Sequence, residues 1–342
     1  MTAGTFQSNC SGGHRPPLQD IDLIDFRPLA ARLGSSLLRQ RLQRQSNLRA
    51  RLVHQGEGPL VVERVVPVDR MIASLLRFTG LAARGQANCL DIRTVVREQP
   101  LANLPASFDG FRLLHISDLH LDCVEGFADR LVEIIARTPN DLAVITGDFA
   151  DHPAGYFHDC LPDIARVAAA LGPGALAILG NHDIIEITPH LEASGLRVLL
   201  NENLAIERDG EKLWFAGIDD PHFYRTHDLE AARRGIPQGA CAVLLSHSPE
   251  TFEDARHYGF NFMLSGHTHG GQICLPGGIA IVRNGRCPPA QFAGAWSHHG
   301  LHGYTSAGTG SCGVAARFNC PPEMTVHVLR MAPSTYSTIS IL

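Results

Sequence analysis

Side chains that could bind a metal follow several apolar segments of the chain. Residues 264–272 read LSGHTHGGQ, where His267 and His269 stand one residue apart on a glycine-rich turn. A His-x-His pair alone is weak evidence for a metal site. Four other apolar segments also end in acid, amide or imidazole groups, so the pair is part of a wider pattern. The groups at these five ends are Asp118 and His120 in ISDLH, Asp148 in TGDFAD, Asn181 and His182 in LGNHD, His247 in LLSHSP, and His267 with His269.

Turn and helix-cap chemistry explains an Asp, Asn or Gly at the end of a strand, but it does not favour histidine repeatedly. Two carboxylates, an amide oxygen and four histidines form a nitrogen and oxygen ligand set that borderline divalent metals accept. Seven donors exceed the needs of one tetrahedral ion, and a bridging carboxylate divides them between two. Two ions about 3.5–4 Å apart stabilise both oxygens of an in-line displacement at phosphorus. We therefore predict a dinuclear centre.

Strand and helix patterns that alternate from about residue 90 to 195 predict the elements that bring these groups together. Such alternation indicates βαβ units, and the carboxyl ends of their strands share one edge of a sheet. Beyond residue 195 we expect a hairpin with Asp209 and Gly210 at its turn, two more apolar strands, and a last strand at 324–331. The five polar ends then meet at one site.

The motifs, taken in order, resemble those of the calcineurin-like metallophosphoesterase superfamily. The stretch after residue 264, with Arg317 and CPPE at 320–323, and LPASFDGF at 104–111 are similar to a branch of bacterial phosphodiesterases. That branch includes membrane-associated members and a UDP-diacylglucosamine pyrophosphohydrolase. The resemblance implies an α/β fold, a four-layer αββα sandwich of two mixed β-sheets flanked by helices. The motifs are D-x-H at 118–120, G-D-x-x-D at 147–151, G-N-H-D at 180–183, a lone His247 and G-H-x-H at 266–269.

The resemblance also implies how the ligands divide. One ion is held by Asp118, His120 and His269, the other by Asn181, His247 and His267, and Asp148 bridges them. The nucleophile is a hydroxide held between the ions. Manganese is the expected metal, and iron, zinc and magnesium remain alternatives because nitrogen and oxygen ligands admit all four.

Further roles follow for residues near the ligands. The resemblance places His182 at the leaving-group oxygen as a proton donor, with Asp183 orienting His182 by a hydrogen bond and Asp151 in a structural role. Arg317 either contacts substrate phosphate or makes a structural ion pair.

Four other histidines and one cysteine are not among the predicted ligands. His115 is predicted to be packed inside a strand. The cluster of His298, His299 and His302 either reaches substrate or lies on a surface loop. Cys123 has no predicted nucleophilic role.

Residues 1–89 are predicted to form a partly helical extension before a catalytic domain at 90–332 and a tail at 333–342. Residues 36–53 place leucines among arginines, as in a basic amphipathic helix, and a second apolar helix is expected at 69–83. Two interpretations stay open for 36–83. The helices pack on the catalytic domain, which we favour, or they contact an anionic membrane surface.

Composition places few limits on partners. A net charge of −5, from 29 basic and 34 acidic residues, does not indicate binding to nucleic acid. Nine scattered cysteines without a C-x-x-C pair indicate reduced thiols, and the first residues do not read as a secretory signal. We expect a cytoplasmic protein, with peripheral contact at the inner face of the membrane as a further hypothesis.

The leading hypothesis is a metal-dependent phosphoesterase that hydrolyses a phosphodiester or pyrophosphate bond of a small phosphorylated substrate. A lipid-linked nucleotide such as UDP-diacylglucosamine is preferred within that class. A cyclic-nucleotide phosphodiesterase or nuclease would use the same centre. A non-catalytic scaffold with this fold is expected to lack a ligand or His182, and here every one is present.

Overall fold

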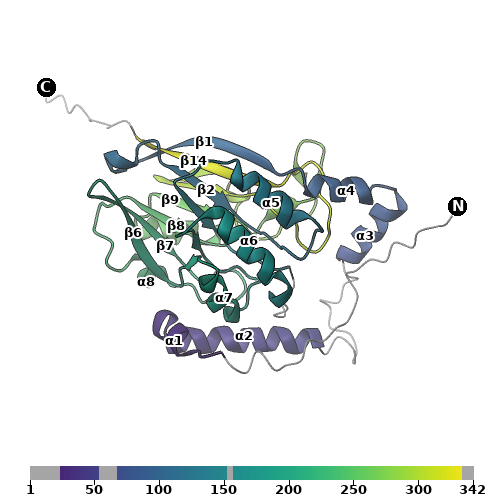
Figure 1. The fold of residues 1–342 in the computed structure, drawn as a ribbon, viewed down its shortest axis with the longest axis horizontal. Coiled ribbons are helices and arrows are strands. Elements are labelled where there is room, and N and C mark those ends of the chain that lie inside the picture. The colour runs from purple at the N-terminus through teal and green to yellow at the C-terminus, as the bar shows by residue number, and fades with distance from the viewer. Residues whose placement is uncertain (1–23, 54–67, 152–156, 333–342) are drawn as a thin grey trace.

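The computed structural model describes residues 24–53, 68–151 and 157–332. Two six-stranded sheets form its centre (Figure 1). The first sheet has the order β1-β14-β2-β3-β4-β5, and β2 to β5 run parallel. Its strands are β1 (Arg93–Leu101), β14 (Glu323–Met331), β2 (Arg112–Ile116), β3 (Leu142–Ile145), β4 (Leu176–Ala177) and β5 (Arg197–Val198).

The second sheet has the order β12-β13-β9-β8-β7-β6. Its four central strands are parallel, and antiparallel β6 and β12 form the edges, so both sheets are mixed. The strands are β12 (Gly294–His298), β13 (Leu301–Thr305), β9 (Phe262–Ser265), β8 (Ala242–Leu245), β7 (Glu211–Gly217) and β6 (Glu202–Arg208). A separate small hairpin joins β10 (Cys274–Leu275) to β11 (Ile279–Ala280).

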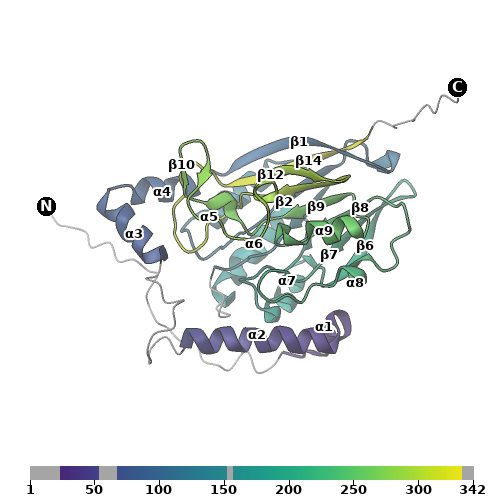
Figure 2. The same cartoon turned by 180° about the vertical axis from the view of Figure 1, so that it is seen from behind.

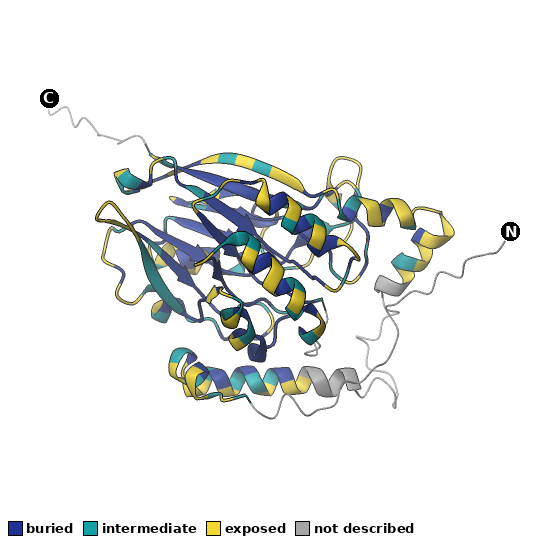
Figure 3. Cartoon of the chain, viewed as in Figure 1, coloured by how far each residue is buried: buried dark blue, intermediate teal, exposed yellow. Residues whose placement is uncertain are grey.

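Three apolar cores separate four layers, as the resemblance implied. The first core lies between the two sheets and includes Val144 of β3 and Phe215 of β7. A second core lies between the first sheet and α5 (Phe127–Ala136), α6 (Leu161–Leu171) and α7 (Thr188–Ala193), and a third lies under α8 (Leu229–Arg233) and α9 (Phe252–His257). Figure 3 shows the buried strands between helices that are exposed on their outer sides.

Most of the predicted elements are confirmed. The hairpin turns at Asp209 and Gly210, between paired Arg208 and Glu211, and the last strand is β14. The helix expected at 69–83 is wrong as one element, because it divides into α3 (Val68–Phe78) and α4 (Ala82–Cys89). Gly80 lies between them with a φ of 73°, a conformation that glycine adopts readily and that ends a helix.

Helices α1 (Arg27–Leu33) and α2 (Ser35–Val53) pack on the two-sheet body through buried Leu29, Leu33 and Leu38 and through charged and polar side chains. Helix α2 runs along the lower edge of the molecule in Figure 1. Arg41 is fully buried, and its Nη1 donates to Asp219 Oδ1 at 2.8 Å. Gln45 donates to Glu186 Oε2 at 2.7 Å. These contacts support packing, the interpretation favoured for residues 36–53, over a membrane role for this helix.

None of the helices in the described ranges is long and apolar enough to cross a membrane. The first twenty-three residues lie outside the described ranges. They include Cys10 and the segment that is predicted not to be a secretory signal. Seven of the described cysteines are free thiols, namely Cys89, Cys160, Cys241, Cys274, Cys287, Cys312 and Cys320.

Candidate metal centre

The carboxyl ends of five strands, three from the first sheet and two from the second, bring the predicted ligands to one place. Asp118 and His120 follow β2, Asp148 follows β3, and the other ligands follow β4, β8 and β9. Five ligand residues have a positive φ, between 40° and 69°. Non-glycine residues rarely adopt such angles, and strained backbone of this kind concentrates at functional sites. These five residues are Asp118, His120, Asp148, His267 and His269.

One group of ligand atoms comes from Asp118, His120 and His269. The two Nε2 atoms of the histidines lie 3.1 Å apart, and His269 Nε2 lies 3.5 Å from Asp118 Oδ1. All three side chains are buried, and Asp118 Oδ2 has no hydrogen-bond partner in the described part of the chain. A buried, unpaired carboxylate oxygen beside two facing imidazole nitrogens fits a cation between them.

A second group comes from Asn181, His247 and His267. Asn181 Oδ1 lies 2.8 Å from His247 Nε2 and 2.8 Å from His267 Nδ1. His247 Nδ1 donates to the carbonyl oxygen of Thr146 at 2.8 Å. That hydrogen bond leaves His247 Nε2 free to face Asn181, which is how metal-binding histidines are commonly oriented.

Asp148 lies between the two groups. Its Oδ2 is 3.2 Å from His247 Nε2 in the second group and 3.7 Å from His120 Nε2 in the first. Its Oδ1 accepts a hydrogen bond from the backbone nitrogen of His182 at 2.9 Å. One carboxylate oxygen therefore faces both groups while the other is fixed by the backbone.

Two of the candidate ligand histidines are held in the neutral form that binds metals, whereas a cation at His247 has to displace a proton. Burial lowers the pKa of His267 and His269 well below the usual value, so both rings are neutral, the form that binds metals. Burial also opposes protonation of His247, but the adjacent Asp148 carboxylate outweighs burial and raises the pKa of His247 to about 10. The donor set of the seven residues predicted from the sequence, and its burial, are compatible with divalent cations.

Two glycines let the ligand loops approach each other. A Cβ at Gly266 would overlap Ser117 Oγ and Asp118 Oδ2, and one at Gly180 would overlap Asp148 Oδ1. Neither glycine needs a positive φ. They are required for space, because the loops pack without room for a methyl group.

His182 is positioned differently from the expectation. Its Nδ1 lies 2.6 Å from the carbonyl oxygen of Asp151, which orients the ring. Asp183 instead accepts hydrogen bonds from the backbone nitrogens of Asp148, Phe149 and Gly180 at 2.7–2.9 Å. The prediction that Asp183 orients His182 directly is therefore corrected, since Asp183 fixes the loops that carry Asp148 and Asn181.

Arg317 is not a phosphate ligand in this structure. Its side chain is fully buried and donates to the Gly310 carbonyl oxygen and to Ser311 Oγ. Its Nη2 lies 3.3 Å from His269 Nδ1. A guanidinium enclosed by the protein cannot fork onto substrate, so the substrate-binding hypothesis is wrong. Arg317 holds the loop at Gly310 and Ser311 instead.

The remaining histidine candidates lie away from the ligands. His302 pairs with Phe262 at the beginning of β9, whereas the ligands follow Ser265 at its end. His298 and His299 lie at the turn between β12 and β13, the strand that contains His302. His115 is fully buried, as predicted, with Nε2 2.9 Å from Thr146 Oγ1, and burial lowers its pKa to about 3.

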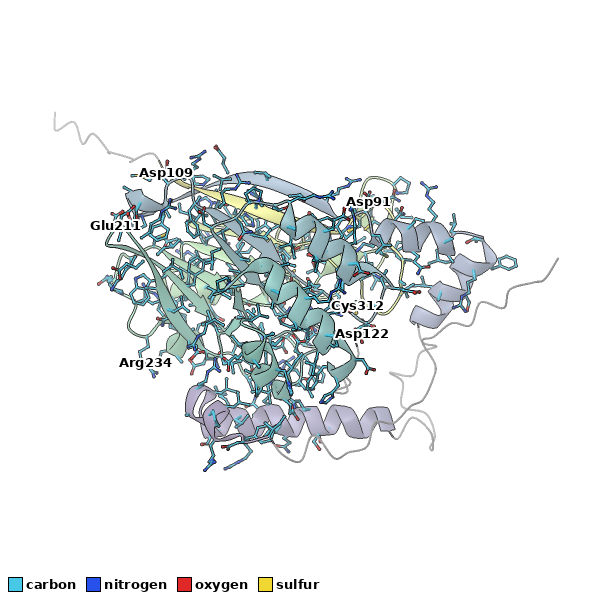
Figure 4. All side chains as sticks on the ribbon, viewed as in Figure 1. Asp91, Asp109, Asp122, Glu211, Arg234 and Cys312 are labelled. Atoms are coloured by element: carbon cyan, nitrogen blue, oxygen red, sulfur yellow. The ribbon has the colours of Figure 1, made fainter. Side chains whose placement is uncertain are left out.

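Two polar groups beside the centre were missed in the sequence. His222 Nδ1 lies 2.8 Å from Glu250 Oε1, and its ring centroid is 4.1 Å from that of His267. Cys312 Sγ lies 3.7 Å from His182 Nε2. Figure 4 places Cys312 at the same end of the molecule as Asp122. His222 and Glu250 lie five residues beyond the ends of β7 and β8, and Cys312 lies in a loop, so the pattern of polar residues directly after a strand marked none of them.

Comparisons with known proteins agree with this geometry. The profile described as calcineurin-like phosphoesterase matches residues 111–271. The uncharacterized metallophosphoesterase YkuE of Bacillus subtilis is 32% identical over 240 residues, covering 66% of this chain and 82% of YkuE. YkoQ of the same organism, also an uncharacterized metallophosphoesterase, is 29% identical over 269 residues, 74% of this chain and 96% of YkoQ.

A third relative has a named activity. Phosphodiesterase YaeI of Escherichia coli is 28% identical over 231 residues, which is 63% of this chain and 81% of YaeI. All five ligand motifs, from Asp118 to His269, fall within the residues that the profile matches. The chain therefore belongs to the calcineurin-like phosphoesterase family.

Proposed function

We propose that the protein hydrolyses a phosphodiester or pyrophosphate bond with two divalent metal ions. The observation that carries this proposal is the position of Asp148 Oδ2 between the ligand group of His120 and that of His247. Similarity to a protein named phosphodiesterase supports the same reaction class. Manganese remains the metal we propose first.

The residues of the chain divide the work of the reaction. When bound, two such ions supply a water of lowered pKa and positive charge beside the phosphoryl oxygens. Asp118, Asp148 and the ligand histidines hold that charge in place. Because His182 Nδ1 is engaged by the Asp151 carbonyl oxygen, its Nε2 is the atom that can give a proton to the leaving oxygen.

We further propose a lipid-linked nucleotide, such as UDP-diacylglucosamine, as the substrate. An exposed apolar surface supports this choice, because acyl chains bind to such surfaces. We call it the apolar surface. It consists of Met71, Leu75 and Phe78 on α3 and of Leu275, Ile279, Ile281 and Val282 on and after the β10–β11 hairpin, each more than half exposed.

The apolar surface adjoins the metal centre. Leu76 of α3 packs with Val314 and Ala316, and Ile273, just before β10, packs on the same cluster. A Cβ at Gly271, two residues after ligand His269, would meet Ala280 of the hairpin. Figure 2 shows β10 beside α4, near this end of the second sheet. A lipid-linked nucleotide whose diphosphate lies at the centre can therefore extend its acyl chains over the apolar surface.

Contact with a membrane surface through α3 is part of this proposal. Exposed Arg77 stands among the apolar side chains of α3, and exposed Arg283 and Arg286 follow the hairpin. Arginines beside exposed apolar groups favour the boundary of an anionic bilayer, where the apolar groups insert and the arginines meet lipid phosphates. Peripheral association at the cytoplasmic face of a membrane is the corresponding localisation.

The test combines metal analysis with a substrate panel. Manganese-loaded protein is incubated with UDP-diacylglucosamine, an unacylated UDP-sugar, a synthetic phosphodiester, cyclic nucleotides and oligonucleotides. We expect UMP from the lipid and much slower hydrolysis of the unacylated sugar. Asp148→Asn is the matched control, because it keeps the size of the side chain and removes the charge.

The outcomes test the substrate, the reaction class and the enzymatic activity separately. Absence of UMP at high enzyme concentration removes the lipid-linked substrate. Preference for cyclic nucleotides or oligonucleotides assigns the alternative phosphodiesterase or nuclease function to the same centre. Failure to hydrolyse any substrate, with an unchanged metal content in Asp148→Asn, overturns the enzyme proposal and leaves a scaffold.

A further inference from the structure

A further group of ligand atoms adjoins the dinuclear centre and shares His120 with it. His120, Asp151, His182 and Cys312 each place one ligand atom within 4.8 Å of the others. Cys312, Asp151 and His182 are half-buried, so solvent reaches the group. The group contains a thiol, which the dinuclear centre does not.

The distances within this group match those around a tetrahedral ion. Cys312 Sγ is 3.7 Å from His182 Nε2, and Asp151 Oδ1 is 3.3 Å from His120 Nδ1. With zinc bonded to sulfur and nitrogen at roughly 2.3 and 2.0–2.1 Å, tetrahedral angles separate two ligand atoms by about 3.4–3.6 Å. Modest movement of the side chains brings them to bonding positions.

The backbone of the group is held in place independently of any ion. Gln272 Oε1 accepts from the backbone nitrogen of Cys312 at 2.9 Å, and Gln272 Nε2 donates to the carbonyl oxygen of Cys312 at 3.0 Å. The backbone nitrogen of Gly313 donates to Asp151 Oδ1 at 3.0 Å. Buried His120 Nδ1 lies 3.3 Å from Asp151 Oδ1, so this carboxylate also faces the ring of His120.

We propose that Cys312, His182 and Asp151 bind a third, thiophilic divalent cation, with Zn²⁺ the best match to a sulfur, nitrogen and oxygen set. His120 keeps Nε2 for the dinuclear centre, so solvent completes the coordination of the third ion. Cys312 releases its thiol proton to solvent when the ion binds. With three protein ligands and one position open to solvent, the site can exchange its metal ion with solution.

Zinc at this site removes the proton donor from the reaction. His182 Nε2 cannot bind the ion and protonate a leaving group at the same time. The third zinc ion is therefore inhibitory. This consequence rests on the proposed function, whereas binding itself does not.

Cobalt provides a direct test of binding, because Co²⁺ bonded to a thiolate gives an ultraviolet charge-transfer band. The dinuclear ligands include no cysteine, so the band does not come from that centre. We expect the band on adding Co²⁺ to the manganese-loaded protein, its loss on adding Zn²⁺, and its absence in Cys312→Ser. Cys287→Ser, which removes a different half-buried thiol, keeps the band.

Zinc binding and activity complete the experiment. Equilibrium dialysis is expected to show one zinc ion more in the wild type than in Cys312→Ser, with affinity lower by about tenfold or more in the variant. The extra zinc slows hydrolysis by the wild type, and Cys312→Ser keeps its basal rate. A missing cobalt band, or one that persists in folded Cys312→Ser, overturns the site. A normal band without inhibition refutes only the inhibitory role.

Discussion

Arg41 Nη1 and Asp219 Oδ1 lie 2.8 Å apart, and neither side chain is exposed to solvent. Arg41 Nη2 also donates to the carbonyl oxygen of Asp183 at 2.6 Å, and its guanidinium lies 3.8 Å from the ring centroid of Tyr224. A helix of the N-terminal extension thus supplies a buried cation behind the loop that carries Asn181 and His182.

Replacing Arg41 is expected to destabilise the whole domain. Arg41→Met leaves the Asp219 carboxylate buried without a counter-charge, a change that costs about 3–5 kcal/mol. Urea unfolding measures the free energy directly. Arg137→Ala, at an exposed pair on α5, is the control and should change stability by less than about 0.5 kcal/mol. Adding Asp219→Asn to Arg41→Met should recover most of the loss, and no recovery would contradict the buried-pair explanation.

Asp148→Asn is expected to lower metal content and activity together. The change removes the charge that faces both ligand groups while retaining a side chain of the same size. Loss of a residue that only hydrogen-bonds to a metal ligand commonly lowers metal affinity or activity by about 10–100-fold. Loss of the carboxylate shared by both ligand groups should therefore lower them by about a hundredfold or more. Elemental analysis and rates over a metal titration measure both. Unchanged manganese content would refute the shared role.

The two histidines of the G-H-x-H motif are expected to affect different ions. His269→Ala removes the partner of His120 Nε2, whereas His267→Ala removes a partner of Asn181 Oδ1. Each variant should retain about one ion per chain under conditions where the wild type binds two. Metal counting by dialysis distinguishes the variants from the wild type, and equal loss of both ions in both variants contradicts the division.

His182→Gln is expected to slow catalysis without emptying the centre. Proton transfer by a positioned side chain contributes about 10²–10⁴-fold, so kcat on a substrate with a poor leaving group should fall by that amount. With p-nitrophenolate as the leaving group the loss should be much smaller, because this anion departs without a proton. An equal loss on both substrates would assign His182 a different role.

The exposed apolar side chains of α3 are expected to matter only for lipid substrates. Phe78 is 91% exposed, and burying such a side chain against acyl chains contributes about 1.5–3 kcal/mol. Phe78→Ser should therefore raise KM for UDP-diacylglucosamine in mixed micelles by about tenfold or more. KM for a soluble phosphodiester should not change. Val96→Ser, at an exposed apolar residue on β1, is the matched control.

The meeting of the candidate ligands at one edge was predictable because each follows an apolar run of the chain. β3, β8 and β9 are buried along their whole length, and such runs are the clearest strand signals in a sequence. The residue types after them then identified the chemistry. Local pattern alone was enough to select Asp118 and His247.

Other features depended on contacts between distant segments. Arg317 follows a glycine-rich stretch, which suggested access to phosphate, but the tertiary fold encloses its side chain against Gly310 and His269. Likewise, β1 pairs with β14 through Arg93 and Glu323, which lie far apart in the sequence. Periodicity carries no information on such pairing.

The close approach at Gly180 and Gly266 has a consequence for mutational scanning. A methyl group at either position collides with a ligand side chain or its neighbour, so a glycine-to-alanine change should abolish activity as completely as loss of a ligand. An assay that scores only growth or turnover would not distinguish a glycine that is needed for close packing from a residue that is needed as a ligand. Residue intolerance across the five motifs therefore overstates the number of groups that take part in the reaction.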